Sequence, residues 1–255
     1  MRMKLVVAIG IALGLAGCIL KDTRHTIYID PRGAVVWTVL EEDVRSDTEA
    51  AADREREECE WLAAALSGDH NVARGLAFLG GDPETRVLRA ERPFVVWTQA
   101  SFERYDELAR RLVDGLGLPG RLEVTASGEE AGFSFELDLA TIDESTTVEE
   151  PLLSLLDGIE NARLVLTEGR FVAAEGFVLD EAGRVARPVA PPSEQLEAKQ
   201  GIVRWRLSWL PGPAAPAAAA EVSRPGALEA ADEPERSGDG QHCRLPCETV
   251  PGPRS

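Results

Sequence analysis

The feature that most limits the possible folds is a series of short strand-like segments paired across turn residues. Apolar stretches within residues 25–40 flank the tetrapeptide Asp-Pro-Arg-Gly at 30–33, whose residue types suit successive positions of a type I turn. Residues 85–102 predict a second hairpin and residues 122–139 a third, because alternating apolar, β-branched and aromatic residues are typical of half-buried strands. Further strands are predicted at 163–166, 171–179 and 202–210.

Helical patterns separate these hairpins. Ser46 and Glu49 have the spacing of a capping box. Four apolar residues then share one face of a predicted helix that ends near Gly68: Cys59, Leu62, Ala63 and Leu66. A second amphipathic helix is predicted at 105–116 and a short helix at 152–156. Because hairpins with interspersed helices favour an antiparallel sheet with helices on one face, the predicted fold class is α+β.

The first two hairpins share four letters. Val35–Thr38 and Val95–Thr98 both read Val-Val-Trp-Thr, each in the returning strand before a helix, which suggests a duplicated ββα unit. The tryptophans at 37, 97, 205 and 209 are interpreted as core residues, because each lies where a strand alternates toward a covered face. The alternative is an aromatic platform for a glycan or peptide ligand.

The composition changes after residue 210. Residues 211–255 are rich in proline, alanine and acidic residues, and we expect a disordered tail because they lack the apolar content that offsets ordering entropy. Residues 25–210 then form a single predicted domain. The chain has 44 acidic and 27 basic residues and a formal charge of −17, which argues against nucleic acid as a partner.

The N-terminus has the pattern of an export signal. Arg2 and Lys4 precede the apolar run Leu5–Gly14, of about ten residues, whereas a membrane-spanning helix needs about 20 and a signal peptide core about 7 to 15. The next residues, Leu15-Ala16-Gly17-Cys18, resemble the lipobox of bacterial lipoproteins position for position.

The resemblance to lipobox lipoproteins implies a maturation pathway. Residues 1–17 would be a signal peptide cut before Cys18, which would carry a diacylglyceryl group on its sulfur and a further acyl chain on its amino group. Two or three acyl chains hold a protein at a membrane almost permanently, and residues 18–24 would form the lipidated end and a short tether. Ile19 is not the aspartate that retains such proteins at the inner membrane of enteric bacteria, so the outer membrane, facing the periplasm, is favoured. The hairpin that follows loosely resembles LppM-type lipoprotein domains.

Two motifs could indicate catalysis or a cofactor. Gly115, Gly117 and Gly120 fit the letters of a dinucleotide-binding motif, but they close a predicted helix and precede a strand, the reverse of the order that such a site needs. They are therefore interpreted as a helix cap, and no cofactor is predicted. Glu136 and Asp138 share one side of a predicted strand, at a separation of about 7 Å that suits paired carboxylates in a hydrolase. The alternative is a solvated acidic face.

The positions of the cysteines and histidines in the sequence do not indicate a metal site. Cys59 is interpreted as an inert core thiol on the predicted helix face. Cys243 and Cys247 lie in the tail and form a candidate disulfide, because export makes disulfides possible. A metal site at these two cysteines with His242 would offer only three ligands on an unstructured segment. The three histidines, 25, 70 and 242, are scattered.

Two functions remain open from the sequence. The leading hypothesis is a lipid-anchored cell-envelope lipoprotein that acts as a non-catalytic binding or assembly module, with the membrane as one partner through Cys18 and an envelope protein, glycan or lipid as another. The alternative is a hydrolase of an envelope polymer that uses Glu136 and Asp138.

Overall fold

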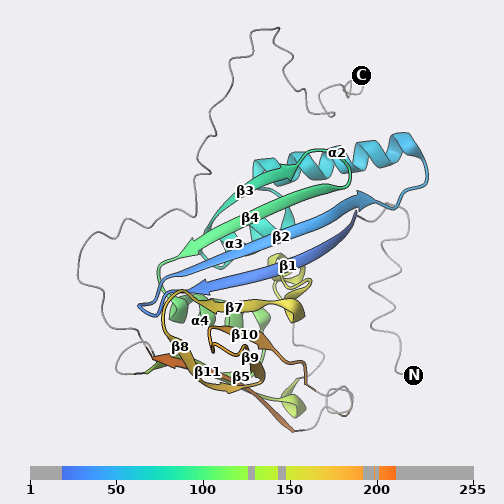
Figure 1. The fold of residues 1–255 in the computed structure, drawn as a ribbon. Helices are drawn as coiled ribbons and strands as arrows, with labels where there is room; N and C mark the ends of the chain where they lie inside the picture. Colours follow the sequence, from blue (N-terminus) through green and yellow to red (C-terminus); the bar gives the residue numbers. More distant parts are fainter. Residues whose placement is uncertain (1–18, 126–129, 143–147, 192–197, 199–200, 211–255) are drawn as a thin grey trace, which may run out of the picture. The chain divides into compact units, whose positions relative to one another are not determined.

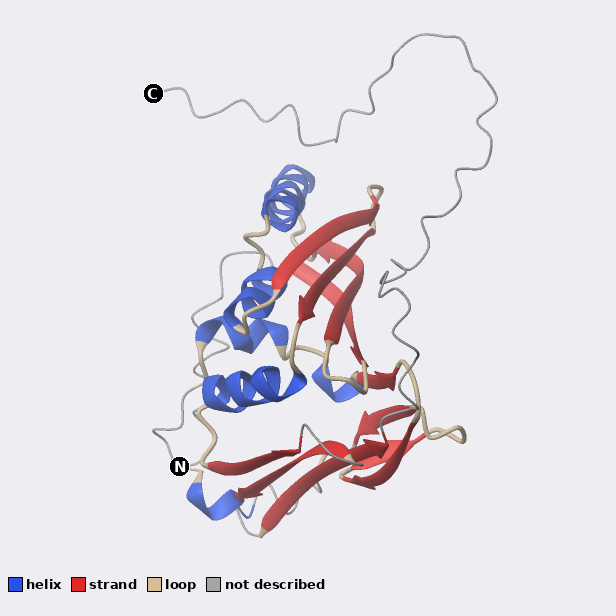
Figure 2. Cartoon of the chain, turned by 90° about the vertical axis from the view of Figure 1, so that its left-hand side faces the viewer, coloured by secondary structure: helices blue, strands red, loops and turns tan. Residues whose placement is uncertain are grey.

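The computed structural model describes residues 19–125, 130–142, 148–191, 198 and 201–210. All of them belong to one compact unit, residues 1–211. Their strands form two sheets, with helices packed against them (Figures 1 and 2). The predicted α+β class is therefore confirmed, although the strands form two sheets where the sequence suggested one.

The larger sheet has seven strands in the order β3-β4-β2-β1-β7-β10-β9. Its members are β1 (Ile19–Ile29), β2 (Val35–Ser46), β3 (Asp82–Arg89), β4 (Phe94–Phe102), β7 (Arg163–Leu166), β9 (Phe177–Leu179) and β10 (Val185–Pro188). The hairpins β1–β2 and β3–β4 meet where β2 pairs with β4. β1 also pairs with β7 in parallel, an exception in an otherwise antiparallel sheet.

The smaller sheet has four antiparallel strands in the order β5-β6-β11-β8. They are β5 (Gly120–Thr125), β6 (Ala131–Asp138), β8 (Arg170–Glu175) and β11 (Ile202–Leu210). Alternation buries Phe135 and Leu137 of β6 and Leu207 and Trp209 of β11, as the sequence predicts for Trp209.

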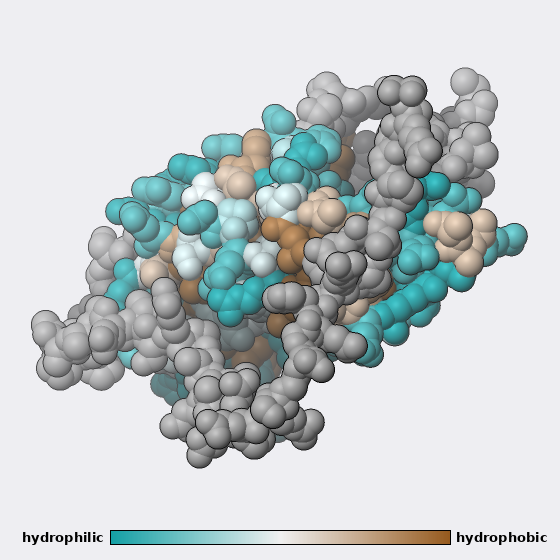
Figure 3. Space-filling view, turned by 90° about the horizontal axis from the view of Figure 1, so that it is seen from above, coloured by the Kyte–Doolittle hydropathy of each residue, from teal (hydrophilic) through white to brown (hydrophobic). Residues whose placement is uncertain are grey.

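The helices are α2 (Ala51–Ser67), α3 (Asn71–Phe78), α4 (Tyr105–Leu116) and α5 (Glu150–Leu155), with short 3₁₀ turns η1 (Leu139–Thr141) and η2 (Ile159–Asn161). Figure 2 shows the α-helices on one side of the larger sheet, which we call its inner face. The opposite side, the outer face, carries no helix among the described residues. Viewed from above, the described surface is mostly hydrophilic with a few apolar side chains between (Figure 3).

The main core lies between the inner face, the helices and the smaller sheet. Trp37 and Val39 of β2, Leu76 of α3 and Leu155 of α5 are fully buried in one cluster that also includes Trp209 of the smaller sheet. Burying each large apolar side chain stabilises the fold by about 1.5–3 kcal/mol. This cluster holds β1 and β2 firmly in place, and the other side of these two strands forms part of the outer face.

Several local predictions differ from the structure. Ser46 ends β2 and is not a helix cap, because α2 begins only at Ala51, with Ala50 before it; the Ser46 backbone N–H donates to Glu58 Oε1 at 2.9 Å. The predicted apolar face of α2 is partly wrong. Cys59 and Leu62 are buried as expected, but Ala63 and Leu66 are exposed, Leu66 to 48%, and Ala65 is buried instead. Helix α3 was not predicted. Residues 19–24, expected in a tether, belong to β1.

Candidate functional site

The two carboxylates of the hydrolase hypothesis have structural roles. Glu136 accepts a hydrogen bond from Arg204 Nε at 2.6 Å on the neighbouring strand. Asp138 caps η1 by accepting from the backbone N–H of Ala140 at 3.0 Å. Neither residue lines either of the cavities described for this structure. The structure therefore gives the hydrolase hypothesis no support.

The glycine motif has the role predicted for it. Gly117 ends α4 in the left-handed conformation, with φ at 60°, and its N–H donates to the Asp114 carbonyl. Gly120 begins β5. Within the described residues, no group of three or more His, Cys, Asp and Glu side chains is placed to hold a metal ion.

Of the four cysteines, the structure describes Cys59. Cys18, Cys243 and Cys247 lie outside the described residues. Cys59 is buried, as predicted, but it is disulfide-bonded, so the prediction of a free core thiol is wrong. The helical pattern could locate Cys59 on a buried face, but it could not indicate that a second sulfur reaches that face.

The tryptophans do not share one environment. Trp37 and Trp209 are fully buried, and Trp205 stacks on Phe135 with ring centroids 6.0 Å apart. Trp97 is on the outer face instead, where the Arg86 guanidinium carbon lies 5.7 Å from its ring centroid. The expectation that Trp97 is a core residue is therefore wrong. The matched letters of the two hairpins place their tryptophans on opposite faces.

A large polar cavity lies beside the free edge of β1. On that edge β1 pairs with β7 only over Thr26–Ile29, so the segment from Lys21 to His25 faces the turn Asp157–Asn161 with no strand between them. The cavity has a volume of about 760 Å³ and extends along β10 to Arg187. Of its fifteen lining residues, only Leu40, Gly158 and Pro188 lack a polar side chain. Its volume lies within the range of about 300–1,000 Å³ that is usual for small-molecule sites.

His25 fixes the turn that forms one wall of the cavity. Its Nε2 donates to the Asp157 carbonyl at 2.8 Å, and its Nδ1 accepts from Trp37 Nε1 at 3.1 Å. Burial lowers the pKa of His25 despite the hydrogen bond to Asp157 and the nearby charge of Glu41. A neutral ring with both nitrogens bonded holds the turn rather than acting as a base.

A buried charged group lies beneath the same strands. Glu41 is 0% exposed and forms an ion pair with Lys21, and its Oε2 lies 3.4 Å from His70 Nε2. Burial alone would raise the pKa of Glu41, but the interactions with His70 and Lys21 outweigh it and hold the pKa below its ordinary value. Glu41 therefore remains ionised, and Lys21 serves as its ion-pair partner.

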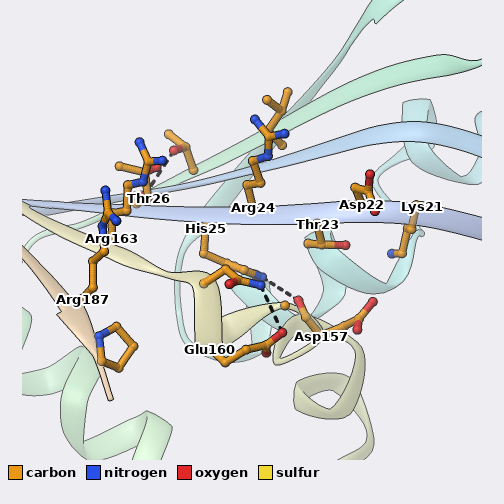
Figure 4. A pocket seen from close by; sticks show the side chains of 15 residues that line it. Lys21, Asp22, Thr23, Arg24, His25, Thr26, Asp157, Glu160, Arg163 and Arg187 are labelled. Carbon is orange, nitrogen blue, oxygen red and sulfur yellow. Dashed lines mark hydrogen bonds between the residues drawn. The ribbon is translucent and has the colours of Figure 1, made fainter. Parts of the chain in front are cut away.

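The outer side of the cavity carries three arginines. Figure 4 shows Arg24, Arg163 and Arg187 directed to one side of β1, with His25 and Asp157 on the other. Arg24 forms an ion pair with Glu42 at 3.0 Å. Arg163 and Arg187 are exposed and make no ion pair with any described residue. Their guanidinium groups are thus available to a ligand.

Sequence reasoning did not find this cavity. Its residues come from 21–26, 38–40, 157–163 and 187–188, and only the sheet order brings β1, β7 and β10 together. Strand β10 was not predicted, so no sequence signal placed Arg187 near Arg163. Of the predicted features, the hairpin containing His25 and the strand at 163–166, which begins with Arg163, contribute to the site.

Comparison with known proteins gives little further information. No protein-family model matches the sequence, and no curated protein matches it. Among solved structures, the folded domain of Mycobacterium tuberculosis LppM, determined by NMR, is a weak structural neighbour. The two chains share 12% sequence identity with a TM-score of 0.33, over 75% of this chain and 90% of that chain. Similarity at this level carries no argument about fold or activity. Among the described residues, no helix is long and apolar enough to cross a membrane.

Proposed function

We propose that the chain is a lipid-anchored lipoprotein of the bacterial cell envelope whose α+β domain is a non-catalytic binding module. The signal pattern and the lipobox at residues 15–18 support export and an acyl anchor on Cys18, with the outer membrane as the favoured site. A disulfide at Cys59 is in keeping with export, because disulfides persist in oxidising compartments.

The outer face of the larger sheet is the observation that carries the binding role. Helices cover the inner face, and the outer face carries the arginine side of the polar cavity and exposed side chains such as Tyr28, which is 40% exposed. Because β1 begins at Ile19, the strand that lines the cavity follows Cys18 directly. At about 3.3 Å per residue, the cavity would lie a few tens of ångströms at most from a lipid on Cys18.

Site-specific photocrosslinking tests the binding role. A photoreactive amino acid replaces Tyr28 on the outer face, and a matched control replaces Leu66 on α2, which has a similar exposed fraction of 48%. Irradiation of intact cells should give a discrete adduct with an envelope component from position 28 and none from position 66. Equal labelling from both positions, or none from position 28, would contradict a binding surface on the outer face.

A further inference from the structure

We propose that Arg163 and Arg187 bind the phosphate group of a small phosphorylated sugar in the cavity beside β1. This inference rests on the proposed binding role and names the ligand class. It concerns the outer part of the cavity, where the two guanidinium groups have no acidic partner among the described residues.

The ladder register places the two arginines opposite each other. β10 and β7 pair antiparallel, with Val185 opposite Val165 and Ala186 opposite Leu164, and the next step of that register sets Arg187 opposite Arg163. Side chains in such positions have Cβ atoms about 4.5–5.5 Å apart, and like charges there are destabilising. In a chain with 44 acidic residues, two facing arginines without a described carboxylate partner indicate an anionic ligand.

Charge and geometry favour phosphate over a single carboxylate. A phosphate monoester carries about −1.5 to −2 charges at neutral pH, which two guanidinium groups balance. Arginine also presents a planar fork of donors that bonds phosphate oxygens in pairs. The two side chains can therefore contact one phosphate from two adjacent strands.

The rest of the lining fits a hydroxylated carrier. A phosphate group alone would fill only a small part of a cavity of about 760 Å³. Thr26, Thr38 and Asn161 line it, and on the arginine side Asp22 offers a carboxylate that accepts hydrogen bonds from hydroxyl groups. With Leu40 and Pro188 as the only apolar side chains in the lining, an acyl chain would find little surface to bury. A sugar matches this polar wall.

Calorimetric titration of the full-length protein in a non-ionic detergent tests the proposal. The probes are glucose 6-phosphate, glucose 1-phosphate, glucose and inorganic phosphate. At least one sugar phosphate should bind, at least tenfold more tightly than inorganic phosphate, and glucose should give no measurable binding. Absence of binding by both sugar phosphates overturns the proposal, and equal affinity for inorganic phosphate overturns the sugar part of it.

Matched variants assign the site. Arg163→Gln and Arg187→Gln should each weaken sugar phosphate binding at least tenfold, whereas Arg170→Gln, at an exposed arginine on β8, should leave it unchanged. Protection of Arg163 and Arg187 from phenylglyoxal by the sugar phosphate, mapped by mass spectrometry, gives a second readout in the wild-type protein. Unchanged affinity in both variants would overturn the assignment. Crosslinking from position 28 does not depend on these arginines. If it succeeds while sugar phosphates fail to bind, the proposed binding role stands and only the proposed ligand class is wrong.

Discussion

Arg187 and Arg163 lie one residue beyond the last pair of the β7–β10 ladder, Ala186 with Leu164, so the same register sets them opposite each other. If this pair is kept for binding, it should lower the stability of the ligand-free protein. Arg187→Glu creates an opposite-charge pair and should stabilise the fold by about 1 kcal/mol, a rise of about 2–4 °C in melting temperature for a domain of this size. Thermal unfolding followed by circular dichroism measures the change. Arg170→Glu is the control, and a lower melting temperature for Arg187→Glu would refute the repulsion.

The buried His25 should make stability depend on pH. Because its folded pKa is lowered, the unfolded state binds a proton more readily, so the stabilisation is fully present above pH of about 6.5 and is lost as pH falls through the folded pKa, with a slope of up to about 1.4 kcal/mol per pH unit. His25→Gln retains a donor for the Asp157 carbonyl but cannot titrate. Urea unfolding between pH 5 and 7.5 should show a shallower decline for the variant. Parallel declines in both proteins would exclude His25 as the cause.

Because Lys21 forms an ion pair with the buried Glu41, substitutions of the two residues should have coupled effects on the free energy of unfolding. Lys21→Met removes the charge that balances Glu41 and should destabilise the fold by about 2–4 kcal/mol, because His70 is then the one ion-pair partner left to the buried carboxylate among the described residues. Adding Glu41→Gln should recover part of that loss, since the unpaired charge disappears. Denaturant unfolding of the single and double variants measures the coupling energy. Strictly additive losses would show that the two groups do not interact.

Sequence patterns identified the α+β class and most strands because alternation and turn residues are local signals. The β1–β2 turn at 30–33 and the strand at 163–166 match the structure. The errors arise where distant contacts decide the outcome. Ser46 bonds to α2 instead of capping it, and Trp97 lies on the outer face because its neighbours along β4, Val96 and Thr98, are the buried ones. The cavity depends on β1 meeting β7 and β10, which no local pattern specifies.

Gly158 should be essential to the cavity wall. Its φ is +76°, and a Cβ atom there would lie 2.6 Å from the Thr23 carbonyl oxygen. Gly158→Ala should therefore cost about 3 kcal/mol or more, combining the left-handed penalty of about 1–2 kcal/mol with displacement of the turn from β1.

Gly68→Ala is the matched control for Gly158. Gly68 has nearly the same φ, +79°, but a Cβ atom would meet nothing within 4 Å. This variant should lose only the backbone penalty, about 1–2 kcal/mol. Denaturant unfolding compares the two. Equal losses would mean that the approach of the turn to Thr23 is not tight.

The disulfide at Cys59 bears on two predictions about the other cysteines, the lipid on Cys18 and the bond between Cys243 and Cys247. With one disulfide at Cys59, a thioether on Cys18 and a bond between Cys243 and Cys247 cannot all form within one chain of four cysteines. If Cys18 carries lipid, its sulfur is used, and Cys59 must pair with Cys243 or Cys247. Non-reducing peptide mapping should therefore recover Cys59 joined to a tail peptide. A Cys18–Cys59 peptide would contradict lipidation.

Mass spectrometry of the N-terminal peptide of the protein purified from bacterial membranes tests the proposed anchor most directly. The mature chain should begin at Cys18, carry a diacylglyceryl group on its sulfur, and lose both the lipid and its detergent partitioning when Cys18 is replaced with Ala. Recovery of a mature chain with an unmodified or disulfide-bonded Cys18, or unchanged detergent partitioning of the Ala variant, would show that the protein is not anchored as proposed.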